Sequence, residues 1–161
     1  MRLIRRYRFS ASHRLHAPSL EPRVNQEIYG KCNNPYGHGH DYLLEVAVGG
    51  DADEATGRLV PVGRLDRFVE SVILKSMDRR DLNSEVEEFR ALVPTTENLA
   101  AVVAARLEAA WPEEFTRASA RLEKVRIHET KRNIFEVNLG RNVPNGNVSS
   151  GDKQAHIKAN S

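Results

Sequence analysis

The chain has 161 residues, enough for one domain with its own core, and its single cysteine excludes an internal disulfide framework. Its 24 basic and 22 acidic residues leave a net charge of +2, which gives no sign of nucleic acid or a membrane as a partner. The first residues lack the apolar run of a signal peptide and no stretch has the length of a membrane span, so we expect a cytoplasmic protein.

The N-terminal part of the chain predicts two strands joined by a long loop. Residues 2–13 alternate in polarity, which is typical of a strand, and Tyr7, Phe9 and Ala11 share a face with His13 at its end. Residues 14–37 are rich in Pro, Asn and Gly and are expected to form a loop; loops this long usually have a function. Residues 40–49 predict a second strand, whose apolar side chains continue the face of His40.

The middle of the chain predicts a turn and two helices. Residues 51–57 resemble a turn, and residues 58–62 are a candidate extension of the hairpin. Apolar residues recur with helical spacing over residues 62–77 and again over residues 96–111. Thr95 or Thr96 is the expected N-cap of the second helix, and Pro112 is expected to help end it.

Two further strands are expected at about residues 121–130 and 133–140, joined by a tight turn at Lys131 and Arg132. The order ββααββ predicts an α+β domain, in which a four-stranded antiparallel sheet carries two helices on one face. This domain is expected to span residues 1–140. Residues 141–161 are polar and without periodicity, which indicates a C-terminal tail.

The segment Gly30–Tyr42 contains the only cysteine, Cys32, and two histidines one residue apart. Because side chains alternate along a strand, His38 and His40 project to the same side and form a candidate pair of metal ligands. His13 is a candidate third ligand, and three histidines around zinc leave a coordination position open for chemistry. A histidine pair alone is weak evidence, since isolated histidines are usually surface or hydrogen-bonded residues. Cys32 is either a reactive thiol, favoured as thiolate if Lys31 lies close, or a small buried side chain.

Glu129 shares a face with Val125 and Ile127 on the expected third strand. Such a carboxylate is either exposed at the strand end or a ligand anchor that accepts two parallel hydrogen bonds from a guanidine-like N–H pair, as in a pterin or guanine ring. Thr96 and Glu97 lie at a helix start, where they either contribute to this pocket or cap the helix.

Four segments in order together resemble the 6-pyruvoyl-tetrahydropterin synthase family, which includes the 6-carboxy-tetrahydropterin synthases, over about residues 3–139. They are Phe9–Leu15, Gly30–Tyr42, Pro94–Asn98 and Glu129–Thr130. The five residues between Cys32 and His38 resemble the pyruvoyl-forming branch, because the carboxy-forming enzymes of the queuosine pathway typically have a shorter spacing.

This resemblance implies the tunnelling fold, in which trimers build a barrel, two trimers stack into a homohexamer, and the active sites lie between subunits. It implies zinc as the cofactor, held by His13, His38 and His40. It also implies a lyase that converts 7,8-dihydroneopterin triphosphate to 6-pyruvoyl-tetrahydropterin with loss of triphosphate. Cys32 would abstract the proton, and Glu129 would anchor the pterin with Thr96 and Glu97 nearby.

The segment Met77–Asn83 departs from the family pattern, because Arg79 follows Asp78 where the family usually has a histidine. That Asp–His pair works with the cysteine, and arginine does not release its proton near neutral pH. Arg79 would instead lower the pKa of a nearby thiol or bind phosphate, with His16 and His128 as candidate substitutes for the histidine. The alternatives are therefore a 6-carboxy-tetrahydropterin synthase or a pterin-binding protein with impaired turnover. A structural zinc protein is disfavoured by the open three-histidine site.

Overall fold

The structure is a computed structural model that describes residues 1–115 and 120–140, and its centre is a pair of long antiparallel strands. Strand β1 (Arg2–His13) and strand β2 (His38–Gly49) pair along their whole lengths, from Arg2 opposite Gly49 to His13 opposite His38. This register places the two histidines that begin and end these strands beside each other. The alternation that predicted both strands also determines which side chains face the helices.

Three more strands complete the sheet in the order β3–β1–β2–β4–β5. Strands β4 (Arg121–His128) and β5 (Ile134–Asn138) are antiparallel to their neighbours, as the sequence predicts, but both are shorter than expected. The two-residue strand β3 (Arg80–Asp81) pairs in parallel with β1, so the sheet has five strands rather than the predicted four. Two residues are too few to show a period in the sequence, which explains why β3 was not predicted.

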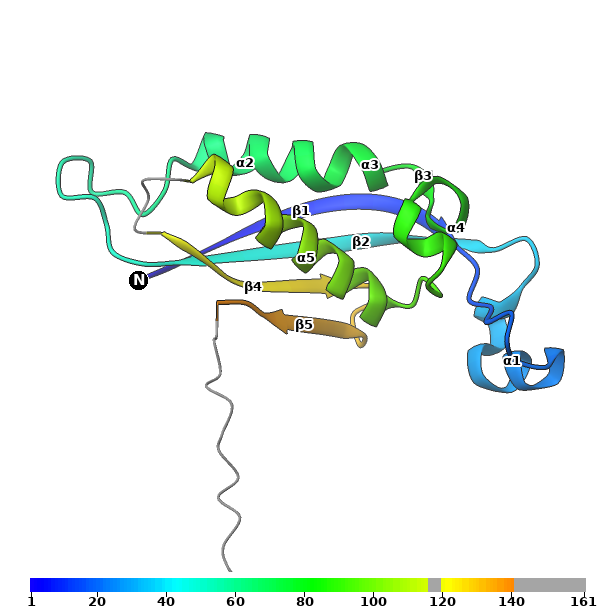
Figure 1. Cartoon of the computed structure of the whole chain (residues 1–161). Helices are drawn as coiled ribbons and strands as arrows, with labels where there is room; N and C mark the ends of the chain where they lie inside the picture. The colour runs from blue at the N-terminus through cyan, green and yellow to red at the C-terminus, as the bar shows by residue number, and fades with distance from the viewer. Residues whose placement is uncertain (116–119, 141–161) are drawn as a thin grey trace, which may run out of the picture.

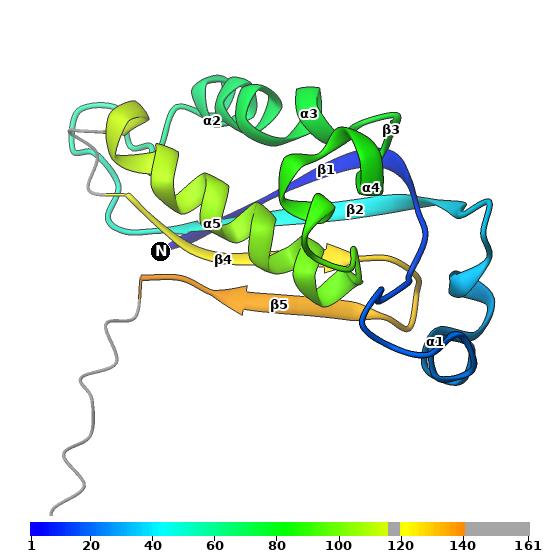
Figure 2. The ribbon, with the colours of Figure 1, turned by 45° about the vertical axis from the view of Figure 1, so that its right-hand side comes forward.

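Helices cover one face of the sheet (Figures 1 and 2). Helix α2 (Val62–Val69), the π-helical segment η2 (Glu70–Leu74) and helix α3 (Lys75–Met77) form the first predicted helix as one continuous run. Helix α5 (Thr96–Glu114) begins at the N-cap Thr95, whose side chain accepts a hydrogen bond from the Asn98 amide. The helix continues past Pro112, which was expected to help end it, and the Phe115 amide donates to the Trp111 carbonyl at 2.9 Å.

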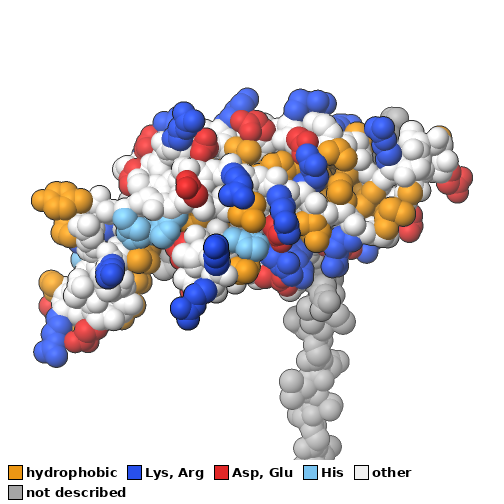
Figure 3. Space-filling model, turned by 180° about the vertical axis from the view of Figure 1, so that it is seen from behind, with side chains coloured by type: hydrophobic (Ala, Val, Ile, Leu, Met, Phe, Trp, Pro, Cys, Tyr) orange, Lys and Arg blue, Asp and Glu red, His pale blue; other side chains and the backbone are white. Residues whose placement is uncertain are grey.

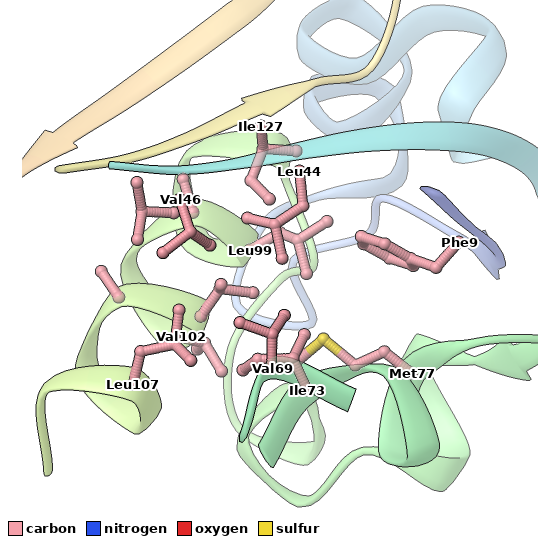
Figure 4. Close-up of a cluster of buried hydrophobic side chains, with 14 of the residues drawn as sticks. Phe9, Leu44, Val46, Val69, Ile73, Met77, Leu99, Val102, Leu107 and Ile127 are labelled. Carbon is pink, nitrogen blue, oxygen red and sulfur yellow. The ribbon is translucent and has the colours of Figure 1, made fainter. Parts of the chain in front are cut away.

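The core fills the space between these helices and the sheet (Figure 4). Its side chains come from the helix-facing positions of β1, β2 and β4 and from the apolar stripes of α2, η2, α3 and α5, and they are almost fully buried. Those labelled in Figure 4 are Phe9, Leu44, Val46, Val69, Ile73, Met77, Leu99, Val102, Leu107 and Ile127. This packing fixes which face of each strand is covered, and therefore the face on which the histidines lie.

The segment 14–37 is not the irregular loop that the sequence predicts. It contains helix α1 (Pro22–Tyr29) and the short 3-10 helix η1 (Gly30–Asn33). The fully buried Asn25 connects it internally, because its side chain donates to the Ala17 and Leu20 carbonyls and accepts from the Ala17 amide. The Leu15 amide donates to the Cys32 carbonyl at 2.8 Å, which ties η1 to the end of β1.

Short helical segments also occur between β3 and α5, namely α4 (Leu82–Glu85) and the 3-10 helix η3 (Glu87–Arg90). The candidate hairpin extension at residues 58–62 is wrong, since Val62 begins α2 and no strand covers this segment. The predicted tail at residues 141–161 lies outside the described residues.

The other face of the sheet carries rows of charged side chains (Figure 3). Glu45 is nearly buried there, because Arg6 donates to it at 2.9 Å and Arg126 lies 3.4 Å away. His128 also lies on this face, with its Nε2 atom 3.6 Å from Glu45. In the described part of the chain, no helix is both long and apolar enough to cross a membrane.

Candidate active site

Three imidazole rings meet at one end of the central strand pair. The centroids of His13, His38 and His40 lie 4.7–5.0 Å from one another, and each pair of rings is close to perpendicular. His13 stands opposite His38 in the strand register and Ala11 stands opposite His40, so all three side chains lie on the helix-facing side. The structure therefore brings together the three histidines that the sequence singles out.

The most buried of these rings has its orientation fixed by the chain that precedes α5. His13 is fully buried, and its Nδ1 atom lies 2.9 Å from the Pro94 carbonyl oxygen. A carbonyl only accepts, so Nδ1 carries the proton and the lone pair of a neutral ring is on Nε2. Burial lowers the pKa of His13 to about 4, with smaller contributions from His40 and His38, so the ring is neutral at pH 7.

The arrangement of ring nitrogens fits a metal ion. The Nε2 atoms of His13 and His38 lie 3.3 Å apart, and two nitrogens bound to one tetrahedral zinc at 2.0–2.1 Å would be separated by about 3.3–3.4 Å. The Nε2 atom of His40 is buried without a hydrogen-bond partner among the described residues. A buried polar atom without a partner is costly, and a cation that accepts these lone pairs would remove the cost.

Cys32 lies on η1 beside the histidines. Its Sγ atom and one ring nitrogen each of His13 and His38 all lie within 4.8 Å of one another. Burial raises the pKa of the Cys32 thiol, and the negative charge of Glu129 raises it further. The Lys31 side chain, whose charge would favour the thiolate if it lay close, is exposed.

Glu129 follows β4 directly and turns its carboxylate toward the same place. Its Oε1 atom accepts a hydrogen bond from the Thr96 hydroxyl at 2.8 Å and lies 3.8 Å from His40 Nε2, while Asn133 donates to Oε2 at 3.2 Å. Burial alone would raise the pKa of Glu129, but the hydrogen bonds from Thr96 and Asn133 and the nearby histidines lower it below its usual value. The carboxylate therefore stays ionised and keeps acceptor capacity for a ligand.

The structure does not bring every candidate residue to this place. Glu97, in the first turn of α5, is exposed and is not joined to Glu129 by any hydrogen bond between described residues. The Asp78 carboxylate accepts from the Ser10 amide at 2.8 Å, and the Arg79 side chain is 89% exposed. Neither forms a hydrogen bond or ion pair with Cys32 among the described residues.

Asp78 and Arg79 lie beside the edge of β1, and Arg79 lines a cleft with Ser10, Ser12 and Asp41. Along β1, Ser10 and Ser12 alternate with Ala11 and His13, so the two serines point to the face opposite the histidines. The backbone of Arg79 is left-handed, with φ of 58°, a conformation that costs a side-chain-bearing residue about 1–2 kcal/mol.

Three supporting residues were not identified from the sequence. The Pro94 carbonyl orients His13, and the buried Tyr42 hydroxyl lies 3.4 Å from the same Nδ1 atom. Gly37 has φ of +66°, and a Cβ atom there would lie only 2.9 Å from the His13 carbonyl oxygen. A side chain at this position is therefore disfavoured both by the left-handed backbone and by the close approach of the His13 carbonyl oxygen. The only signal in the sequence was that all three lie within the segments Gly30–Tyr42 and Pro94–Asn98.

Comparison with known proteins identifies the family. A model of the 6-pyruvoyl tetrahydropterin synthase family matches residues 2–139. The chain belongs to this family. The 6-pyruvoyl tetrahydrobiopterin synthase of Drosophila melanogaster is 43% identical over 135 residues, which cover 83% of this chain and 76% of that protein. The human protein of the same name is 39% identical over 130 residues, covering 81% of this chain and 86% of its own length.

Solved structures of 6-pyruvoyl tetrahydropterin synthases have the same fold. The synthase of Caenorhabditis elegans superimposes with a TM-score of 0.78 at 36% identity, covering 86% of this chain and 94% of its own. A Plasmodium vivax synthase superimposes with a TM-score of 0.57 at 16% identity over 85% of this chain and 96% of its own, which supports the fold alone. The predicted α+β tunnelling fold is thus confirmed for a member of the 6-pyruvoyl tetrahydropterin synthase family, with five strands in its sheet.

Proposed function

We propose that this protein is a zinc-dependent lyase that converts 7,8-dihydroneopterin triphosphate to 6-pyruvoyl-tetrahydropterin with release of triphosphate. The observation that carries the proposal is the convergence of three histidines, a thiol and an ionised, partly buried carboxylate at one end of the β1–β2 pair. Family membership and the names of the relatives support the same activity.

Each group has a role that its surroundings support. Zinc held by His13, His38 and His40 would supply Lewis acidity beside the side chain of the substrate. The Glu129 carboxylate would accept two hydrogen bonds from the guanidine-like N–H pair of the pterin, and the Thr96 hydroxyl holds Oε1 in place for this. Cys32 would take the proton from the substrate side chain, since its Sγ atom lies beside the ring nitrogens that would hold the metal.

We propose that Asp78 and Arg79 act at the Cys32 site of a neighbouring subunit in a homohexamer made of two trimers. Arg79 is almost fully exposed and directly precedes β3, which pairs with the edge of β1. The charged, uncovered face of the sheet is consistent with the inner surface of a barrel (Figure 3). Glu97, exposed at the start of α5, is assigned to the same shared site. We place the protein in the cytoplasm, where its single thiol would stay reduced.

The test is incubation of zinc-loaded protein with 7,8-dihydroneopterin triphosphate, followed by mass spectrometry of the products. 6-Pyruvoyl-tetrahydropterin together with inorganic triphosphate is expected. 6-Carboxy-tetrahydropterin would identify the side-chain-cleaving branch instead. A second function, pterin binding with impaired turnover, is favoured by one observation, the exposed arginine at position 79. Tight pterin binding with zero turnover in the presence of zinc would support that function and refute the lyase.

A further inference from the structure

A second cleft of about 420 Å³ adjoins the histidine site, a volume in the range of small-molecule pockets. Three of its lining residues are chain neighbours of residues that build the histidine site. Arg14 follows His13, Gly37 precedes His38, and Val93 precedes the Pro94 that orients His13. Adjacent Cα atoms are 3.8 Å apart, so the cleft begins where the metal site ends.

We propose that this cleft binds the triphosphate of the substrate, with Arg14 as its principal cation. This inference rests on the proposed function for the identity of the substrate. The cleft is also lined by His16 and Arg90, and its one carboxylate is that of Asp81. The Asp81 side chain already accepts hydrogen bonds from Ser12 and Ser84, so the cleft presents cations to a ligand rather than free carboxylates.

Of the two arginines that line this cleft, Arg14 has the guanidinium more available to bind an anion. Its guanidinium makes only long contacts, 3.4 Å to the Asn33 carbonyl and 3.5 Å to His16 Nδ1, and no carboxylate of residues 1–115 or 120–140 forms an ion pair with it. By contrast, Arg90 is paired with Glu87 at 3.2 Å. An arginine with free N–H groups binds phosphate oxygens in a fixed, two-pronged geometry.

The main chain around Arg14 is held firmly. Asn83 accepts a hydrogen bond from the Arg14 amide at 2.8 Å and donates one to the Arg14 carbonyl at 3.0 Å. On the other side, Asn33, the neighbour of Cys32, contacts both Arg14 and His16. The cation is therefore fixed relative to the histidines and to the thiol, as a subsite for the leaving group requires.

The cleft beside β3 is a poorer candidate for an anion. It has about 510 Å³, but Asp41, Asp81 and Glu85 line it, and Arg80 is paired with Glu85 at 2.8 Å. His40 of the histidine site also lines this cleft, so both clefts adjoin that site and the difference between them is their charge. Charge favours the cleft that contains Arg14.

The experiment is calorimetric titration of the zinc-loaded protein with inorganic tripolyphosphate. Wild type is expected to bind it, and Arg14→Met is expected to weaken binding at least about tenfold, as loss of a charged hydrogen bond predicts. Arg14→Lys should restore part of the affinity. The matched control is Arg58→Met, which removes an exposed arginine from the segment between β2 and α2. Zinc content is measured after each titration, so that chelation by the tripolyphosphate is distinguished from binding in the cleft.

Two further measurements separate this inference from the proposed function. Neopterin, which lacks the phosphates, should bind wild type and Arg14→Met equally, and KM for the triphosphate substrate should rise far more than kcat falls. Equal tripolyphosphate affinity in wild type and Arg14→Met, or an equal loss in Arg58→Met, would overturn the inference even if the enzyme is active. Arg14-dependent binding without any turnover would instead leave the cleft assigned and refute the lyase.

Discussion

The Pro94 carbonyl oxygen lies 2.9 Å from Nδ1 of the fully buried His13, and this contact determines which nitrogen of the ring is free. Pro94 precedes the N-cap of α5, where the Thr95 amide donates to the Val93 carbonyl. The start of a helix thus fixes a side chain of β1, and the Nε2 lone pair is directed to the place where His38 and His40 meet.

We expect His38→Ala to remove most of the bound zinc, because only two histidine ligands would remain and zinc sites with an open position normally use three. Elemental analysis of the purified protein checks this. His128→Ala is the matched control, since His128 lies on the opposite face beside Glu45 and should not change the zinc content. Full zinc occupancy in His38→Ala would show that the metal ligands are assigned wrongly.

Strand periodicity explains why so much of the site was predictable. Side chains alternate strictly along β1 and β2, so His13, His38 and His40 had to share a face with the buried Phe9 and Tyr42. To predict that the three histidines lie close together, one must also know that β1 and β2 pair along their whole lengths. Gly37, just before β2, allows the chain to lie close to the end of β1, because a Cβ atom there would lie 2.9 Å from the His13 carbonyl oxygen.

The remaining features depend on contacts distant in the sequence. Helix α1 is stabilised by the buried amide of Asn25 within a segment whose composition resembles a loop. The negative charge of Glu129, 97 positions away along the chain, adds to burial in raising the pKa of the Cys32 thiol. The sequence alone does not bring this carboxylate near the thiol, because β4, which precedes Glu129, reaches the site only through its pairing with β2.

Glu129→Gln is expected to weaken pterin binding by about 1–3 kcal/mol, the scale of a lost charged hydrogen bond, because an amide accepts through one oxygen only. Calorimetry with neopterin measures the change. Glu113→Gln is the control, since this glutamate is exposed on α5. An unchanged affinity in Glu129→Gln would remove the carboxylate from the pterin site, whereas Thr96→Val should reproduce part of the loss by freeing Oε1.

Replacing Cys32 with Ala should abolish turnover and leave bound zinc unchanged, because the three histidines remain. The variant should still bind substrate but fail to exchange the side-chain protons of the substrate with solvent, which NMR in deuterated water detects. Lys31→Met tests the neighbouring cation and is expected to have little effect, since the Lys31 side chain is exposed. Exchange at the wild-type rate in Cys32→Ala would show that another group removes the proton.

Arg79 provides the sharpest test of the proposed reaction, because it is where the sequence departs from the pattern that the family resemblance led us to expect. Its guanidinium lies 3.9 Å from Asp78 and is exposed, and an arginine side chain does not relay protons as an imidazole does. If the reaction needs an imidazole here, the natural protein is slow and Arg79→His raises kcat. If Arg79 instead stabilises the thiolate or holds phosphate, the same change lowers kcat or raises KM.

We expect Arg79→His to raise kcat, since general acid–base groups typically contribute about 10²–10⁴-fold to the rate. Steady-state kinetics with 7,8-dihydroneopterin triphosphate measures it, and Arg80→His is the matched control on the adjacent residue, which is paired with Glu85. Arg79→Asn distinguishes the effect of the left-handed backbone from the effect of the imidazole, because asparagine tolerates that conformation but has no imidazole. Ordinary rates in the natural protein, with Arg79→His no faster, would show that the arginine replaces the histidine without loss.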